Sequence, residues 1–478
     1  MPGLKIALLS VVDRISTIPY GLVSIATYLE KMNPSHETRI FDRAVHNIKK
    51  EILKFNPDII GIGSMTLFYE TAKEVAGEIR EYCSNTLPII IGGVHITTLP
   101  QSFHRCFDIG VIGEGEITFY ELVELYYLER SFHVDKLKKI RGLIFWDGPE
   151  IEATEKRPLV HPLDALPMPD YKYISKTYFE KRYWYGKFKV PGYIMTSRGC
   201  PYKCIFCSTR QFWCKVRVNS PEYVTRYIKQ LIDIHEVHHI TIMDDLFAAN
   251  KKRVRRFIEE FSTQGIDKKI SLSVSMRANL IDDDMCDLLK QLNVVEANFG
   301  FESGSDKILK MIKGDEVSTA MNYRAVDVCM SHGIKPSASF MFGVPGETLD
   351  DMSKTCEFID RVRKKGAILW IFIATPFPAT EFWQIAKKRG KVNDNMDFRL
   401  LDHMIAAEDA LLLDEDIDRN RFKEILSRAS LLIGSRKSEM IKEIILNDPL
   451  GAAMAMVQHP MRNLKKLYTL ITKRYGSI

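Results

Sequence analysis

At 478 residues the chain is too long for one ordinary domain, and we expect two or three. Its 46% hydrophobic and 27% charged residues are typical of a soluble globular protein, and no run reaches the eighteen apolar residues of a membrane span. The net charge of +6, with a pI near 8.6, is a mild basic excess that argues against a nucleic-acid binder.

The cysteine count and the N-terminus indicate a reducing compartment. Nine cysteines are an odd number, which favours free or metal-bound thiols over a disulfide framework. The first residues, MPGLKIALLSVVDR, lack the charged lead-in and cleavage site of a signal peptide. We therefore expect a cytoplasmic protein.

Residues 1–125 alternate short apolar runs with amphipathic stretches. The strand candidates are residues 5–12, 38–42, 57–65, 87–95 and 108–116. Apolar runs of this length between helices predict a parallel sheet covered on both faces. The sequence thus predicts a flavodoxin-like doubly wound α/β domain, which we assign to residues 1–140.

The region 141–190 is less regular, and we assign it to a connector. Residues 142–148 are typical of a hairpin strand, and residues 161–171 contain three prolines, which favour an extended path.

A second α/β series follows in residues 191–385. Its strand candidates are residues 193–197, 239–245, 270–276, 295–301, 336–343 and 370–375. One helix is expected to begin with Ser220-Pro221, a good N-cap followed by a proline in the first turn, and two more are expected after Asn250 and after Asp282. Six such units predict a partial (β/α)6 barrel of the TIM type, because a complete eight-fold barrel usually needs about 250 residues. Residues 386–478 are predicted to be largely helical.

The sequence RGCPYKCIFC (198–207) places Cys200, Cys204 and Cys207 at C-x3-C-x2-C spacing after the first strand of this series. Barrels of this kind bind ligands at such strand ends. Thiolates ligate iron–sulfur clusters and zinc. A four-iron cluster normally takes four cysteines, so three leave one iron open to a ligand that is not protein. Two alternatives remain: three buried apolar cysteines, or a zinc site completed by Cys214 or a histidine.

This stretch resembles the signature of radical S-adenosylmethionine enzymes. The resemblance implies that the three cysteines hold a [4Fe–4S] cluster, that S-adenosylmethionine chelates the fourth iron, and that Phe206 lies beside the adenine. It also implies an external electron donor of the flavodoxin or ferredoxin type and a 5′-deoxyadenosyl radical, so that the cofactors carry the chemistry and the barrel orients them.

Later strand ends resemble the same family. By that resemblance Asp244 lies near the amino group of S-adenosylmethionine, Arg277 near its carboxylate or a substrate anion, and Glu302, with Ser303, near its ribose. Residues 341–349 and 374–383 resemble the family's last strand-end loops. The alternatives are a helix-capping turn for Asp244 and a surface ion pair for Arg277.

The stretch GGVHITTLPQ (92–101) followed by GEGE (113–116) resembles the cobalamin-binding domain that precedes many of these barrels. The resemblance implies a cobalamin at the strand ends. The candidate contacts are Ser64, Gly92, Gly93, His95, Gly113, Glu114 and Gly115. The D-x-H-x-x-G pattern that supplies a cobalt ligand is absent, since no glycine follows His46 at the right offset. The cobalt is therefore expected to have no protein ligand or a weak one, and His95 is a better candidate for packing than for ligation. A front domain that keeps the fold without the cofactor is the alternative.

The segment 461–475, MRNLKKLYTLITKRY, predicts an amphipathic helix with basic residues beside its apolar face. It would pack on the protein itself or rest on an anionic membrane, which leaves peripheral membrane association open.

The leading functional hypothesis is methylation of an unactivated carbon, or phosphorus, of a small molecule or lipid. Formation of a ring or another carbon–carbon bond with the same cofactors is the alternative. A methylthiotransferase is disfavoured because residues 1–140 contain only Cys83 and Cys106, too few for a second cluster. An iron–sulfur redox sensor is the alternative that is not an enzyme.

Overall fold

The computed structural model describes residues 2–13, 18–84, 86–180, 182–184, 187–266, 269–402, 410–414 and 417–447. The chain divides into two compact units. The front unit consists of Met1–Tyr178, Arg198–Asn219 and Thr375–His403, and the barrel unit of Phe179–Ser197, Ser220–Ala374 and Met404–Ile478.

The front unit contains a parallel sheet with the strand order β2-β1-β3-β4-β5. Its strands are β1 (Lys5–Ser10), β2 (Glu37–Asp42), β3 (Ile59–Gly63), β4 (Ile89–Gly92) and β5 (Ile109–Val111). This is the flavodoxin-like order, so the predicted doubly wound fold is confirmed.

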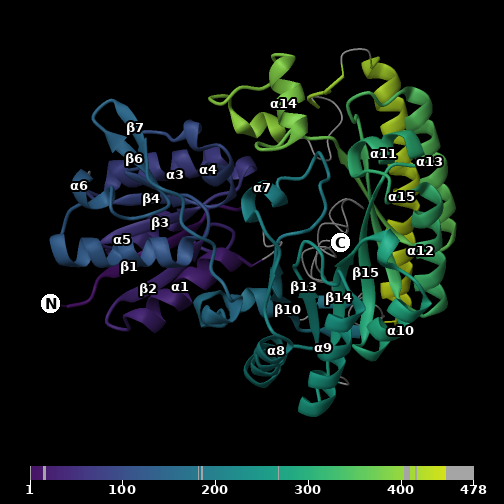
Figure 1. The fold of residues 1–478 in the computed structure, drawn as a ribbon, viewed down its shortest axis with the longest axis horizontal. Coiled ribbons are helices and arrows are strands. Elements are labelled where there is room, and N and C mark those ends of the chain that lie inside the picture. The colour runs from purple at the N-terminus through teal and green to yellow at the C-terminus, as the bar shows by residue number, and fades with distance from the viewer. Residues whose placement is uncertain are drawn as a thin grey trace. The chain divides into compact units, whose positions relative to one another are not determined.

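Helices cover both faces of this sheet, with α1 and α5 on one side and α3 and α4 on the other (Figure 1). The helices are α1 (Tyr20–Met32), α2 (Ile48–Phe55), α3 (Tyr69–Tyr82), α4 (Val94–Thr98), α5 (Gly115–Glu129) and α6 (Val134–Leu137). Ile60 and Ile90 in the central strands are at most 1% exposed. Burial on both faces explains why these strands are continuous apolar runs.

Two antiparallel strands extend the front sheet beyond β5. They are β6 (Leu143–Asp147) and β7 (Glu150–Ala153), which form a hairpin. The predicted hairpin strand therefore forms, but the front sheet continues past the boundary expected at residue 140. Pairing with β6 covers the backbone edge that β5 would otherwise expose.

The barrel unit is built on a six-stranded parallel sheet with the order β10-β13-β14-β15-β16-β17. The strands are β10 (Pro191–Ile194), β13 (His239–Ile242), β14 (Ser271–Met276), β15 (Val294–Glu302), β16 (Lys335–Phe342) and β17 (Ile368–Ile373). All six overlap predicted strands, and the sheet is the predicted partial barrel.

Helices follow these strands, and α10, α12 and α13 pack on the outer side of the sheet (Figure 1). They are α8 (Pro221–His235), α9 (Lys251–Gln264), α10 (Asp283–Gln291), α11 (Asp306–Lys313), α12 (Thr319–Ser331) and α13 (Leu349–Lys364). Ser220, Asn250 and Asp282 accept hydrogen bonds from the first-turn amides of α8, α9 and α10, as their N-cap positions predict.

The segment with the three cysteines is grouped with the front unit. It contains β11 (Ser197–Arg198), α7 (Thr209–Trp213) and β12 (Arg217–Val218), and α14 (Glu381–Lys388) lies in the same unit. The barrel unit also contains the hairpin of β8 (Arg182–Trp184) and β9 (Lys187–Lys189), and α15 (Arg419–Asn447), which packs on α13. The predicted basic helix at 461–475 lies outside the described residues. Within the described part of the chain, no helix has the length and apolarity needed to cross a bilayer.

The turn between β4 and α4 requires a glycine at position 93. Gly93 has φ of +107°, and a Cβ there would lie 2.5 Å from the carbonyl oxygen of Ser64. We expect Gly93→Ala to lower the free energy of unfolding by about 1–3 kcal/mol. The matched control is Gly77→Ala within α3, where nothing lies within 4 Å of the new methyl, and which should stabilise by about 0.5–1 kcal/mol. Urea unfolding followed by circular dichroism measures both; equal effects would contradict the account.

Candidate active site

The cysteine loop is irregular and partly exposed. Cys200 and Cys204 are half-buried, Cys207 is exposed, and none of the three is in a disulfide. The amide of Cys207 donates to the carbonyl oxygen of Cys204 over 3.1 Å, which closes a tight turn. Gly199 has φ of +98°, and a Cβ there would lie 2.6 Å from the carbonyl oxygen of Lys215. The glycine before the first cysteine therefore allows the two ends of the loop to approach.

The start of α14 supports the middle of this loop. The amide of Glu381 donates to the carbonyl oxygen of Ile205 over 2.9 Å. The ring centroid of Phe206 lies 6.1 Å from that of Phe382, which is fully buried. Phe206, the expected adenine neighbour, is itself only half-buried.

The donor set fits an iron–sulfur cluster better than a single metal ion. A four-iron cluster binds each thiolate through a different iron, so its ligands need not converge on one point. Among the described residues, no three His, Cys, Asp or Glu side chains are gathered closely enough to hold one ion. Cys214, the suggested fourth zinc ligand, directs its thiol to the carbonyl oxygen of Gln211 at 3.7 Å. Three thiols on one exposed loop, without a fourth protein ligand, suit a cluster that keeps one iron open.

Asp244 holds the segment that leads into the cysteine loop. Its carboxylate accepts four hydrogen bonds, from the amides and hydroxyls of Thr196 and Ser197. Burial raises the pKa of Asp244 to about 6, although these hydrogen bonds oppose the rise. Both carboxylate oxygens are occupied within the protein, so the geometry favours a capping role over the expected contact with S-adenosylmethionine.

Arg253, in the first turn of α9, supports the same segment and was not singled out from the sequence. Its Nη2 donates to the carbonyl oxygen of Thr196 over 3.0 Å and to its hydroxyl over 3.1 Å. The guanidinium also lies 4.7 Å from the ring centroid of Phe257. Only the fold reveals this role, because an arginine in a first helical turn has no distinctive sequence pattern.

Glu302 ends β15 in a conformation rare for a residue with a side chain. Its φ is +64°, next to a register shift between β15 and β16. Its carboxylate folds back over Gly300, where a Cβ would lie 2.1 Å from Oε1 of Glu302. Burial raises its pKa, while Lys313, whose Nζ is 3.7 Å from Oε1, and Arg277 oppose the rise. Strained backbone at a strand end is a common sign of a functional position.

Two basic side chains accompany Glu302 in the barrel unit. Arg277 is buried and donates from Nη2 to the carbonyl oxygen of Lys313 over 3.0 Å. Arg277 and Glu302 are thus brought together as expected, and Lys313 joins them, which sequence reasoning missed.

Ser303 faces elsewhere: it is fully buried, and its hydroxyl lies 3.2 Å from that of Thr355 on α13. The expected contact of Ser303 with a cofactor is therefore not supported.

One face of the barrel sheet is lined by small polar side chains. Its register rows are Thr241–Ser273–Glu296–Lys335, Ser275–Asn298–Ser337 and Gly300–Ser339–Trp370. The opposite face, with Leu272, Ala297 and Ala338, is buried under the helices. Barrel interiors are usually filled with Val, Ile and Leu. This face is more polar than such interiors usually are, and part of its polar groups bond within the sheet, as Ser273 does to Glu296 and Trp370 to Ser337.

Glu347 stabilises the turn that follows β16. Its Oε2 accepts hydrogen bonds from the amides of Gly343, at 2.8 Å, and Val344, at 3.1 Å. Oε1 is buried and has no hydrogen-bond partner among the described residues. Burial raises the pKa of Glu347 to about 8, so the side chain is largely protonated at neutral pH.

The strand ends of the front sheet leave room for a flat ligand. A Cβ at Gly113, where φ is +86°, would meet nothing within 4 Å, and one at Gly92 would meet nothing closer than 3.8 Å. Met65, which follows β3, is half-exposed, while the hydroxyl of Ser64 beside it donates to the carbonyl oxygen of Met65. These features fit the broad corrin ring of cobalamin at this edge.

Both ring nitrogens of His95 have partners within the protein. Nδ1 lies 3.3 Å from the hydroxyl of Thr66, and Nε2 lies 2.9 Å from that of Ser102. The ring also stacks on that of Tyr69, with 3.9 Å between the ring centroids. Burial lowers the pKa of His95 to about 3, so it stays neutral. The structure supports packing over cobalt ligation for His95. Nδ1 of His46 likewise accepts from the amide of Asp42 over 3.0 Å.

Glu114 and Gly115 also serve internal contacts. The carboxylate of Glu114 binds Arg198 and Arg217, and a Cβ at Gly115 would lie 2.9 Å from Cδ1 of Ile25. These contacts account for the side chain of Glu114 and for the need for glycine at position 115, and the expected contacts of both residues with cobalamin stay predictions.

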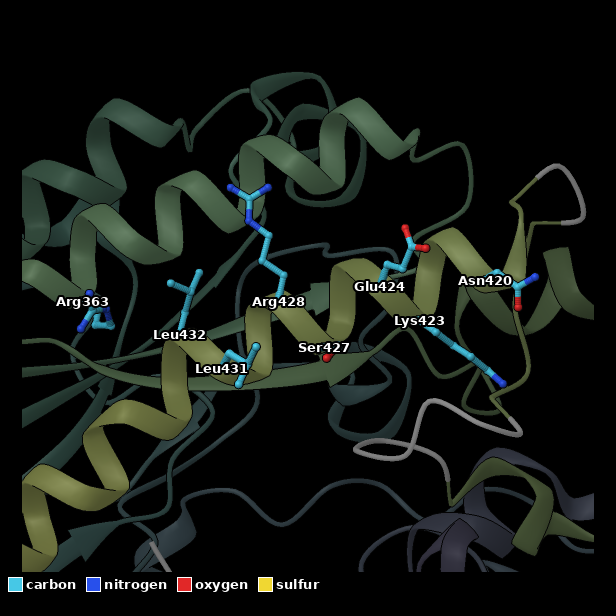
Figure 2. Close-up of a pocket in the computed structure, with 8 residues that line it drawn as sticks. All are labelled: Arg363, Asn420, Lys423, Glu424, Ser427, Arg428, Leu431 and Leu432. Carbon is cyan, nitrogen blue, oxygen red and sulfur yellow. The ribbon is translucent and has the colours of Figure 1, made fainter.

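A separate surface groove of about 890 Å³ lies in the barrel unit (Figure 2). It is lined by residues 420–432 of α15 and by Arg363 of α13. None of the candidate site residues lines it, so it is distinct from the strand ends described above.

Two family models match the chain. Residues 194–359 match the radical SAM superfamily and residues 10–123 match the B12 binding domain. In chain order, an open doubly wound sheet precedes a partial barrel whose first strand is followed by the cysteine loop. Residues 194–359 thus form a radical SAM domain, and residues 10–123 form a B12-binding domain.

Relatives and solved structures extend this likeness over most of the chain. An uncharacterized methyltransferase, PH0819, of Pyrococcus horikoshii is 29% identical over 439 residues, which are 89% of this chain and 90% of that protein. The anaerobic magnesium-protoporphyrin IX monomethyl ester cyclase of Cereibacter sphaeroides is 26% identical over 73% of this chain and 56% of that protein. The structure of OxsB with aqua-cobalamin and S-adenosylmethionine bound has a TM-score of 0.67 over 98% of this chain and 70% of that one. At 17% identity, OxsB shows the shared fold.

We expect Cys204→Ala to abolish cluster assembly, because a four-iron cluster on two thiolates lacks a ligand at a second iron. Iron content and visible absorbance after anaerobic reconstitution measure this. The matched control is Cys214→Ala, an exposed cysteine outside the triplet, which should retain the iron. Full iron retention in Cys204→Ala would contradict the assignment.

Glu347 should make stability depend on pH. The folded chain keeps the proton up to about pH 8, whereas the ordinary pKa is 4.5, so the folded chain binds more protons between these values. Stability should therefore fall as pH rises through this window, by at most about 1.4 kcal/mol per unit. Glu347→Gln keeps the neutral form and should flatten the decline in thermal unfolding midpoints from pH 5 to 8. The control Glu357→Gln, on the exposed side of α13, should leave the decline unchanged. Parallel profiles for wild type and Glu347→Gln would refute this role.

Proposed function

We propose that this chain is a cobalamin-dependent radical S-adenosylmethionine methyltransferase that acts on a hydrophilic small molecule, at an unactivated carbon or a phosphorus atom. The observation that carries the proposal is the cysteine triplet on a glycine-led loop directly after the first barrel strand. The similarity to a methyltransferase over 89% of the chain supports methyl transfer.

In this proposal the chain's own residues bind and orient two cofactors. Cys200, Cys204 and Cys207 hold the cluster. When bound, the cluster supplies an electron to S-adenosylmethionine, and cobalamin supplies a transferable methyl group. Buried Glu302 offers carboxylate oxygens to the ribose hydroxyls, and Arg277 offers a guanidinium to the carboxylate of S-adenosylmethionine. Asp244 and Arg253 act indirectly, by holding Thr196 and Ser197.

The polar face of the barrel sheet supports a hydrophilic substrate over a lipid. Ser275, Asn298 and Ser339 on this face are half-buried, so their hydroxyl and amide groups remain partly accessible. Asn298 donates to the carbonyl oxygen of Val274 and Ser339 to that of Phe299, and an apolar acyl chain would leave their remaining hydrogen-bonding capacity unused, which is costly in a dry site. Trp370, whose Nε1 donates to Ser337 over 3.1 Å, adds one flat aromatic surface. A polar molecule with a planar or ring portion suits this combination.

A second candidate function is ring formation or another carbon–carbon bond with the same cofactors. The similarity to the cyclase over 73% of the chain favours it, although the chain spans only 56% of that protein. Both functions use the same cofactors. They differ in the product, which gains a methyl group in one case and a ring or another carbon–carbon bond in the other.

The test is incubation of reconstituted holoenzyme, with reductant, trideuteromethyl S-adenosylmethionine and either the polar or the lipid fraction of cells that carry this gene. We expect 5′-deoxyadenosine and a trideuterated product in the polar fraction. Label in the lipid fraction would contradict the substrate class. A product that gains no label but loses hydrogen would favour the cyclase, and absence of 5′-deoxyadenosine would favour a redox sensor.

A further inference from the structure

Two arginines flank the cysteine loop at its base. Arg198 belongs to β11 and Arg217 to β12, and these two short strands pair with each other. The chain between them carries all three cysteines of the triplet. The base of the loop is therefore a pair of short strands, with one arginine on each strand.

Both arginines bind the same carboxylate of the front sheet. Arg217 Nη1 lies 2.9 Å from Oε2 and 3.0 Å from Oε1 of Glu114, and Arg198 Nη1 contacts Oε1 of Glu114. Arg198 also reaches Glu116, with Nη2 2.6 Å from Oε1. Glu114 and Glu116 lie where β5 leads into α5, at the strand-end edge of the front sheet.

These four side chains are buried and connected to further elements of the front unit. Their side chains are only 5–11% exposed. Glu116 accepts from the hydroxyl of Ser24 on α1 over 2.9 Å. Glu114 accepts from the amide of Val160 over 2.8 Å, and Arg217 donates to the carbonyl oxygen of the same residue over 2.7 Å. The cluster of charges therefore ties together the cysteine loop, the front sheet and the connector.

The charges balance as two arginines and two glutamates. Removing one partner from a buried set of this kind leaves an uncompensated charge, which is far more costly than removing an exposed pair. Movement of the loop away from the front sheet would separate the arginines from the glutamates and leave any charge that stays buried without its partner. The set therefore resists separation of the loop from Glu114 and Glu116.

We propose that Arg198, Arg217, Glu114 and Glu116 form a charge clamp that positions the cysteine triplet on the strand ends of the B12-binding domain. The clamp residues are positioning residues: they act on the cluster through the loop. Glu114 and Glu116, which lie in the stretch that resembles a cobalamin-binding motif, hold the cluster loop. The proposal rests on the proposed cluster site. It goes beyond the proposed methyl transfer, because it assigns a role to four residues to which that reaction gives none.

The clamp is tested by the rate at which reconstituted holoenzyme releases iron to a chelator. The variants are Arg198→Gln, Glu116→Gln and the double variant, in which the charge balance is restored. The matched control is Arg210→Gln, an exposed arginine of α7 within the same loop. Thermal unfolding and circular dichroism confirm folding, and the electron paramagnetic resonance of the reduced cluster, with and without S-adenosylmethionine, reports its environment.

We expect each single variant to release iron about tenfold faster than the control and to alter the resonance signal, whereas a purely structural role would lower the unfolding midpoint alone. The double variant should release iron no faster than the single ones, because the two side chains act as one unit. Release at the control rate would overturn the clamp, and so would multiplicative effects in the double variant. Should Arg198→Gln fail to fold, the balanced double variant still decides between these outcomes. Absence of iron in wild type would instead overturn the cluster site, and the clamp's role with it.

Discussion

Parallel strands end on the same edge of a sheet, and this constraint brings the candidate site residues of the barrel unit together. Each of several consecutive strands is followed by one candidate site residue. Asp244 follows β13, Arg277 follows β14, Glu302 ends β15, and Glu347 follows β16. Although these residues are separated by some tens of positions in the chain, they therefore share one edge of the barrel sheet.

Direct hydrogen bonds to neighbouring side chains then separate the strand-end side chains into two groups. A buried polar group is costly unless it is hydrogen-bonded, so side chains that face the protein find partners within it. Asp244, His95 and Ser303 belong to this group, since each is buried and hydrogen-bonded to neighbouring side chains. Glu302 keeps a strained conformation near two cations, and the three cysteines remain on an irregular loop, which leaves these residues suited to ligands.

The sequence predicted the local features well. Apolar runs located every strand of both parallel sheets, and the helices expected after Ser220, Asn250 and Asp282 form there. The cysteine spacing predicted the cluster loop. The sequence could not reveal the hydrogen-bond and ion-pair partners of the strand-end residues. Arg198 and Glu114 are 84 positions apart, and no periodicity or spacing connects them. The contribution of β6 to the front sheet was hidden for the same reason, because pairing with an edge strand depends on tertiary contacts.

The central claim is that three thiolates hold a four-iron cluster with one iron open to S-adenosylmethionine. Mössbauer spectroscopy of iron-57 protein, purified without oxygen, tests it most directly. The account predicts a [4Fe–4S] spectrum in which one iron site changes when S-adenosylmethionine is added. A spectrum that does not respond to S-adenosylmethionine, or protein that contains zinc in place of iron, would contradict it.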